Sequence, residues 1–252
     1  MYERISMKKN RFRLLDTIRG IVLISMIIYH ATWNMVYIYG MDWNWYKSRG
    51  AYIWQQSICW TFILLSGFCF SLGKRHLKSG LMVFGGGLLV TLVTLLAMPQ
   101  NRVIFGVLTC IGSCILLLTF TEKFWRKIPT EAGIVMAFLI FLFTKNINSG
   151  YLGLEDFRIA ELPVSWYSNY FTTFLGLPFR GFYSTDYFSL LPWFFLFLTG
   201  FYLHGIWAKY DLLNKKFMHR GVGTFAFLGK HSLLIYLLHQ PVIYGVQEIL
   251  LK

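Results

Sequence analysis

Apolar residues run along this chain in seven long segments that are separated by shorter polar connections. A helix of about 20 predominantly apolar residues crosses the hydrocarbon core of a bilayer, and these segments approach or exceed that length. We therefore predict an all-α, polytopic membrane helical bundle with about seven transmembrane helices, in a single domain over residues 1–252. The predicted spans are residues 14–39, 51–73, 81–98, 103–120, 130–144, 187–207 and 225–251.

Composition and charge agree with a membrane setting. Hydrophobic residues make up 56% of the chain, and the mean hydropathy is +0.52. The formal charge of +13 is not accompanied by a nucleic-acid-binding motif, so we predict no nucleic-acid partner. Fifteen Lys and Arg residues fall in alternate connections (1–13, 74–80, 121–129 and 207–224), against seven on the opposite side. The positive-inside rule then predicts a cytoplasmic N-terminus, an outer C-terminus and basic connections that face anionic membrane lipids.

Two further features bear on organisation. The longest predicted connection runs from Lys145 to Asp186 on the outer side, which is long for a passive connector and indicates a lid or binding element. Residues 170–177 within it favour a short interfacial helix or an aromatic belt. All four cysteines lie within predicted spans, in spacings that fit helix packing rather than an external disulfide or a metal site. They are Cys59, Cys69, Cys110 and Cys114.

The first predicted span contains a cation and an imidazole. Both are costly in a bilayer, so membrane proteins usually keep them for function. Arg19 and His30 are eleven residues apart, which places them on one helix face, roughly 16 Å apart along the axis. This spacing suggests a long ligand that extends between the two. The alternative for Arg19 is a structural ion pair with Asp16, three residues earlier.

Other polar groups in the predicted spans extend this candidate site. His239 in the last span reaches a depth similar to that of His30, and a neutral imidazole can remove a proton from an amine or a hydroxyl. Structural hydrogen bonding remains the alternative for both histidines. The candidate catalytic residues are His30, Asp186 and His239, and the candidate substrate-binding residues are Asn34 and Tyr236.

Several segments together resemble the catalytic domain of the heparan-α-glucosaminide N-acetyltransferase family. They are LDTIRG at 15–20 followed by His30, FILLSG at 62–67, FGVL at 105–108 followed by Ile111 and Gly112, GFYSTDYF at 181–188 with LPW at 191–193, and Gly229 with SLLIYLLHQP at 232–241. Their order is preserved, and the resemblance covers nearly the whole chain.

The resemblance implies transfer of an acetyl group from cytoplasmic acetyl-CoA to an acceptor presented outside. His30 matches the catalytic histidine of the family, and Arg19 matches a basic residue near the coenzyme. Asp16 and Ser66, in matching segments, are further candidates for coenzyme binding. Thr109 and His231 differ from the residues often found there in relatives, which argues against heparan sulfate itself. We expect a cell-envelope sugar or glycolipid as acceptor, in a prokaryotic cytoplasmic membrane.

Three questions stay open from sequence. His30 could act as a general base in direct transfer, which we favour, or as a nucleophile that forms an acetyl-imidazole. The same polar cavity could instead serve a small-molecule transporter, or His30 and His239 could be the axial ligands of a haem. The sequence also leaves open whether the chain forms a homodimer.

Overall fold

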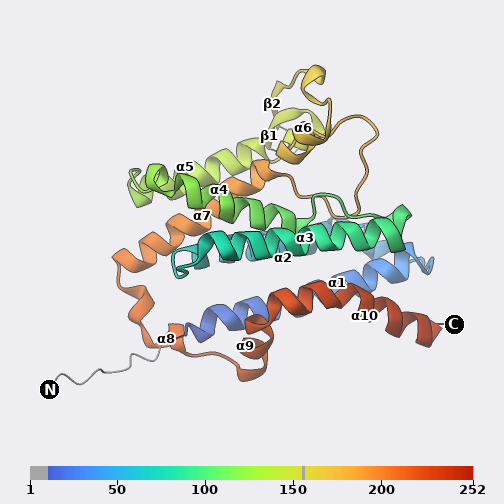
Figure 1. Cartoon of the computed structure of the whole chain (residues 1–252), viewed down its shortest axis with the longest axis horizontal. Coiled ribbons are helices and arrows are strands. Elements are labelled where there is room, and N and C mark those ends of the chain that lie inside the picture. The colour runs from blue at the N-terminus through green and yellow to red at the C-terminus, as the bar shows by residue number, and fades with distance from the viewer. Residues whose placement is uncertain (1–10, 155–156, 252) are drawn as a thin grey trace. The chain divides into compact units, whose positions relative to one another are not determined.

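Seven helical segments in the computed structural model are long and apolar enough to cross a membrane (Figure 1). The structure describes residues 11–154 and 157–251. The seven segments are α1 (Arg13–Tyr37), α2 (Arg49–Phe70), α3 (His76–Ala97), α4 (Val107–Trp125), α5 (Thr130–Thr144, a span with the 3₁₀ turn Ile147–Ser149), α7 (Leu190–Lys209) and α10 (Ser232–Leu251). The predicted multi-pass helical membrane protein is therefore confirmed, with span edges shifted by a few residues.

The last predicted span is wrong in one respect, because residues 225–251 do not form one helix. The helix α9 (Gly223–Lys230) ends at His231, whose φ of −104° and ψ of 18° leave the helical range, and α10 begins at Ser232. Apolar residues continue on both sides of this break, so hydropathy alone does not reveal it. Only α10 is long enough to serve as the span.

The connection between α5 and α7 holds the β-structure of the described residues. The strands β1 (Tyr151–Leu154) and β2 (Phe157–Glu161) pair antiparallel, with a bulge between Leu152 and Gly153. After a 3₁₀ turn at Val164–Trp166, the helix α6 (Tyr170–Leu175) confirms the short helix predicted at 170–177. The Asn169 side chain caps α6, because it accepts hydrogen bonds from the backbone N–H groups of its first turn.

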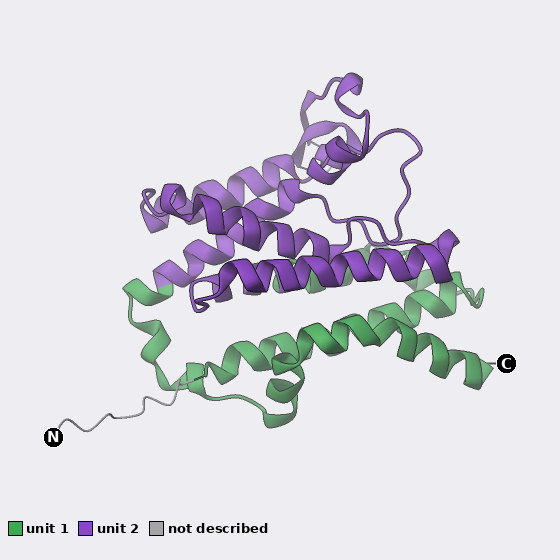
Figure 2. Cartoon of the chain, viewed as in Figure 1, with its two compact units in different colours: residues 1–61, 207–252 green, residues 62–206 purple. Residues whose placement is uncertain are grey.

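The chain divides into two compact units (Figure 2). The first combines residues up to 61 with residues from 207 onward, and the second comprises residues 62–206. The first unit contains α1, α9 and α10, together with the 3₁₀ turns Asn44–Lys47 and Leu212–Asn214 and the short helix α8 (Lys216–His219). The second contains α3 to α6, most of α7 and the 3₁₀ turn Pro99–Asn101, and the boundary after Thr61 divides α2 between the two units. A single functional domain over the whole chain stays a prediction.

Glycines let helices of the first unit approach at backbone distance. A Cβ atom on Gly20 of α1 would lie 2.0 Å from the carbonyl oxygen of Phe225 in α9. A Cβ atom on Gly229 of α9 would lie 1.9 Å from the carbonyl oxygen of Asp16 in α1. Close approach through small residues is a common means of packing membrane helices. The contact fixes α9 against the part of α1 that carries Asp16 and Arg19.

Glycines also allow two helices of the second unit to approach at backbone distance. A Cβ atom on Gly67 of α2 would lie 1.9 Å from the carbonyl oxygen of Phe197 in α7, and one on Gly200 of α7 would lie 2.1 Å from that of Leu64. Each helix of this pair therefore contributes a glycine to the crossing. The signal is present in the sequence only as isolated glycines within apolar runs.

Candidate active site

Two histidines predicted from sequence meet in the first unit, where α1 and α10 run side by side (Figure 1). The ring centroids of His30 on α1 and His239 on α10 are 4.9 Å apart, and the ring planes are inclined by 58°. Both residues are half-buried. Among residues 11–154 and 157–251, no hydrogen bond reaches either ring nitrogen of His30, so both nitrogens are available to a ligand.

The orientation of His239 is set by its own helix. Its Nδ1 atom is hydrogen-bonded to the carbonyl oxygen of Tyr236. Because a carbonyl oxygen can only accept, Nδ1 carries the proton and Nε2 keeps its lone pair. The Nε2 atom is buried and has no hydrogen-bond partner among the described residues. Tyr236, a predicted substrate-binding residue, thus orients His239 through its backbone, and its ring centroid lies 5.1 Å from that of His239.

Three side-chain amides join α1 to α10 beside the histidines. Gln247 Nε2 donates to the carbonyl oxygen of Ala31 at 2.9 Å, and Asn34 Nδ2 donates to Gln247 Oε1 at 2.8 Å. Gln240 Nε2 then donates to Asn34 Oδ1 at 2.8 Å. Asn34, predicted to bind substrate, is fully buried, and both polar atoms of its side chain are engaged in this chain of amides. Sequence reasoning missed Gln240 and Gln247, although their spacing of seven residues places them on one face of a helix.

A charged cluster forms at the start of α1. Arg19 Nη1 lies 3.2 Å from Asp16 Oδ1, which confirms the ion pair that the sequence offered as an alternative for Arg19. Arg11 also binds the Asp16 carboxylate, with Nη2 3.2 Å from Oδ1 and Nε bonded to Oδ2. The hydrogen bond to Asp16 raises the pKa of Arg11. Two guanidinium groups therefore surround the one carboxylate of Asp16.

The helix between this cluster and the histidines is continuous. The backbone of α1 stays helical without interruption from Arg13 to Tyr37, so Arg19 and His30 share one rigid element. Their separation of eleven residues therefore corresponds to roughly 16 Å along the axis, as the sequence predicted.

An aromatic cluster lies next to His30 and was not foreseen. Its buried members are Val36, Tyr46 and Ala51, with Tyr29, Trp33 and Trp54 packed against them. Trp54 Nε1 donates to Ser25 Oγ at 2.8 Å, which ties α2 to α1. Burial raises the pKa of Tyr46, whose hydroxyl donates to the carbonyl oxygen of Tyr29 at 3.3 Å. The concentration of Tyr and Trp over residues 29–54 is the sequence signal that would have revealed this cluster.

The other two predicted site residues belong to the second unit. Ser66 Oγ donates to the carbonyl oxygen of Phe62 at 2.7 Å, within α2. Asp186 Oδ2 accepts a hydrogen bond from Val107 N at 3.3 Å, at the first residue of α4. A carboxylate is favourable there, since it faces the positive end of the helix dipole. The coenzyme-binding role of Ser66 and the catalytic role of Asp186 stay predictions.

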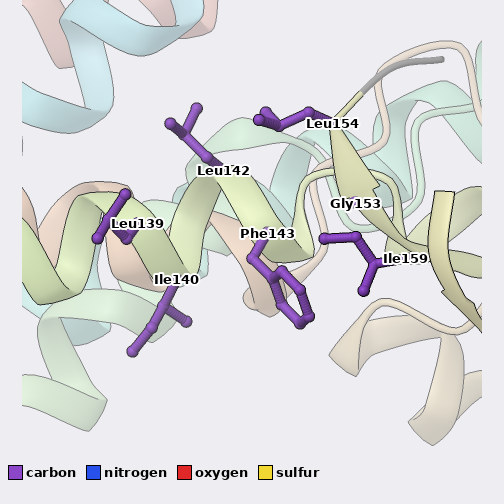
Figure 3. A pocket seen from close by; sticks show the side chains of 7 residues that line it. All are labelled: Leu139, Ile140, Leu142, Phe143, Gly153, Leu154 and Ile159. Carbon is purple, nitrogen blue, oxygen red and sulfur yellow. The ribbon is translucent and has the colours of Figure 1, made fainter. Parts of the chain in front are cut away.

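An apolar pocket of about 460 Å³ lies in the second unit between α5 and the β-hairpin (Figure 3). Its lining residues are Leu139, Ile140, Leu142, Phe143, Gly153, Leu154 and Ile159. None of these side chains can transfer a proton or ligate a metal, so this pocket is not a candidate for chemistry. Within the described residues there is also no group of three or more His, Cys, Asp or Glu side chains placed to hold a metal ion, and the four cysteines form no disulfide.

Comparison with known protein families identifies the class of protein to which this chain belongs. Residues 11–241 match the family model described as heparan-alpha-glucosaminide N-acetyltransferase, catalytic. The match covers most of the 252 residues, so the chain belongs to this family, whose members are membrane acetyltransferases. No curated protein and no solved structure gave a match.

Proposed function

We propose that this protein transfers an acetyl group from cytoplasmic acetyl-CoA to an extracytoplasmic sugar or glycolipid. The observation that carries the proposal is the pairing of His30 with His239 in a chain of this acetyltransferase family. The charge distribution supports a cytoplasmic N-terminus and an outer C-terminus. A prokaryotic cytoplasmic membrane is the proposed location. Assembly as a homodimer stays a prediction.

The cluster at the start of α1 is the proposed receptor for the charged end of the coenzyme. Phosphate groups are recognised by guanidinium groups through charge-assisted hydrogen bonds. Arg11 and Arg19 place two guanidinium groups at this end of α1, both in contact with Asp16. The roughly 16 Å along α1 from Arg19 to His30 is comparable to an extended pantetheine arm. The thioester would then lie near His30.

His30 is the proposed general base in direct transfer. The acceptor oxygen or nitrogen attacks the carbonyl carbon of the acetyl group, and a free ring nitrogen of His30 removes the acceptor's proton. The new bond to the acceptor forms as the carbon–sulfur bond breaks. The proton then passes to the departing thiolate, so coenzyme A leaves as the thiol and His30 returns to its neutral form.

His239 is the proposed partner that orients this base. Its Nε2 atom keeps a lone pair, and its ring lies 4.9 Å from the ring of His30 between centroids. An N–H group of His30 that donates to this lone pair would leave the other His30 nitrogen as the proton acceptor. The pair would therefore select the tautomer of His30 that the reaction needs.

The same geometry argues against the haem alternative. A metal held between two axial imidazoles, with metal–nitrogen bonds of about 2.0–2.1 Å, separates the ring centroids by about 6 Å. The centroids of His30 and His239 are 4.9 Å apart, which is shorter than that separation.

The proposal is tested with purified protein and acetyl-CoA that carries a radioactive acetyl group. The acceptors are a panel of amino sugars and envelope glycolipids, and mass spectrometry identifies any coenzyme that co-purifies. Transfer to one class of acceptor is expected, with release of coenzyme A. Flux of a substrate across vesicles without acetyl transfer would contradict the proposal and favour a transporter.

A further inference from the structure

The chain of amides between α1 and α10 has a fixed direction. At one end it binds the backbone carbonyl of Ala31, which can only accept, so Gln247 must present its amino group there. Gln247 Oε1 then faces the amino group of Asn34, and Asn34 Oδ1 faces the amino group of Gln240. Reversing any one of these amides would bring two oxygens or two amino groups together. The far end of the chain must therefore be the oxygen of Gln240.

That oxygen is left without a donor. Gln240 Oε1 is buried and has no hydrogen-bond partner among the described residues. The preceding residue, His239, also has a buried acceptor. Its Nε2 atom keeps a lone pair and has no hydrogen-bond partner among the described residues. Buried acceptors are nearly always paired in folded proteins, because an unpaired one loses its hydration without compensation.

The two unfilled acceptors lie at consecutive positions of α10, and both side chains reach toward α1. The ring of His239 faces His30, and the amide of Gln240 binds Asn34, which lies one helical turn beyond His30. In the proposed mechanism His30 supplies the donor for His239, which leaves the oxygen of Gln240 for a ligand. A ligand with an O–H or N–H donor is complementary to that oxygen.

We propose that Gln240 binds the acceptor substrate, with Oε1 accepting a hydrogen bond from a hydroxyl or amino group of the sugar. This inference rests on the proposed function and adds a specificity-determining residue to it. Gln240 cannot turn its amino group toward the substrate without breaking its bond to Asn34. Gln240 Oε1 therefore selects a sugar that presents a hydrogen-bond donor to it. A sugar with an ether or a carboxylate at that place would leave Gln240 Oε1 unpaired.

The test compares two variants on the acceptor that wild-type protein acetylates best among the amino sugars and glycolipids. Gln240→Met keeps the length of the side chain and removes the amide. We expect its KM for the acceptor to rise about tenfold or more, with the KM for acetyl-CoA unchanged. The matched control is Tyr39→Phe, which removes the 3.1 Å hydrogen bond from the Tyr39 hydroxyl to Glu248 of α10. Its acceptor KM should not change, although its thermal stability should fall.

A purely structural role for Gln240 would make Gln240→Met behave like Tyr39→Phe, and that result would overturn the inference. A second measurement needs only the wild-type protein, in case Gln240→Met does not fold. Methylating the acceptor's non-reacting hydroxyl and amino groups one at a time should raise KM about tenfold at one position. Equal KM values for all methylated acceptors would also overturn the inference. If wild-type protein transfers acetyl to no probe, the proposed function fails, and the role of Gln240 fails with it.

Discussion

Gly229 of α9 lies directly against the backbone of Asp16 in α1. A Cβ atom on Gly229 would be 1.9 Å from the Asp16 carbonyl oxygen and 3.0 Å from Gly20 N. The neighbouring atoms belong to the backbone, so they cannot move aside as the end of a flexible side chain could. This contact holds α9 against the part of α1 that carries the proposed coenzyme cluster.

Substituting Gly229 by Ala should therefore destabilise the protein. Overpacking of this kind costs about 1–3 kcal/mol, which exceeds the roughly 1 kcal/mol that Ala gains over Gly in a helix. Thermal unfolding in detergent measures the effect. Gly245→Ala in α10 is the control, because nothing lies within 4 Å of a Cβ atom there, and it should be neutral or slightly stabilising. Equal stability of the two variants would show that the α1–α9 contact is looser than a backbone-to-backbone approach.

Arg19→Ala should weaken the binding of acetyl-CoA by about 1–3 kcal/mol, because a charge-assisted contact to the coenzyme is lost. Calorimetry on folded protein measures this affinity. Arg158→Ala is the control, since Arg158 is an exposed guanidinium on β2, on the side of the membrane predicted to face away from the coenzyme. An unchanged affinity in Arg19→Ala would contradict the coenzyme-binding role and favour a structural role for Arg19, such as its ion pair with Asp16.

The membrane topology is tested by cysteine labelling in a background with the four native cysteines replaced. Lys74 lies in the exposed connection between α2 and α3, and Ser165 lies exposed in the connection between α5 and α7. A membrane-impermeant maleimide applied from outside should label Ser165→Cys and spare Lys74→Cys, because the charge distribution places these connections on opposite sides. Permeabilised membranes should show labelling at both positions. Labelling of both from one side would contradict the seven-span topology.

Hydropathy was sufficient to predict the number and approximate position of the spans, because apolar runs of this length are typical of membrane-spanning helices. It could not show the break at His231, where apolar residues continue on both sides and α9 packs on the backbone of α1. The similar depths of His30 and His239 agree with their meeting in space. The role of the amides was missed because it depends on the pairing of α1 with α10, a tertiary contact that neither helix reveals alone.

The proposed chemistry depends above all on the imidazole of His30, and His30→Gln is the sharpest test of it. Glutamine keeps hydrogen-bonding capacity but cannot act as a base, and a general base contributes about 10²–10⁴-fold to a reaction. The measurement is acetyl transfer by folded His30→Gln protein, alongside its affinity for acetyl-CoA. We predict a loss of transfer of about 10²-fold or more with donor binding largely retained, because the proposed coenzyme cluster lies at the other end of α1. Transfer at the wild-type rate would contradict this mechanism, since the imidazole would then only position the substrate.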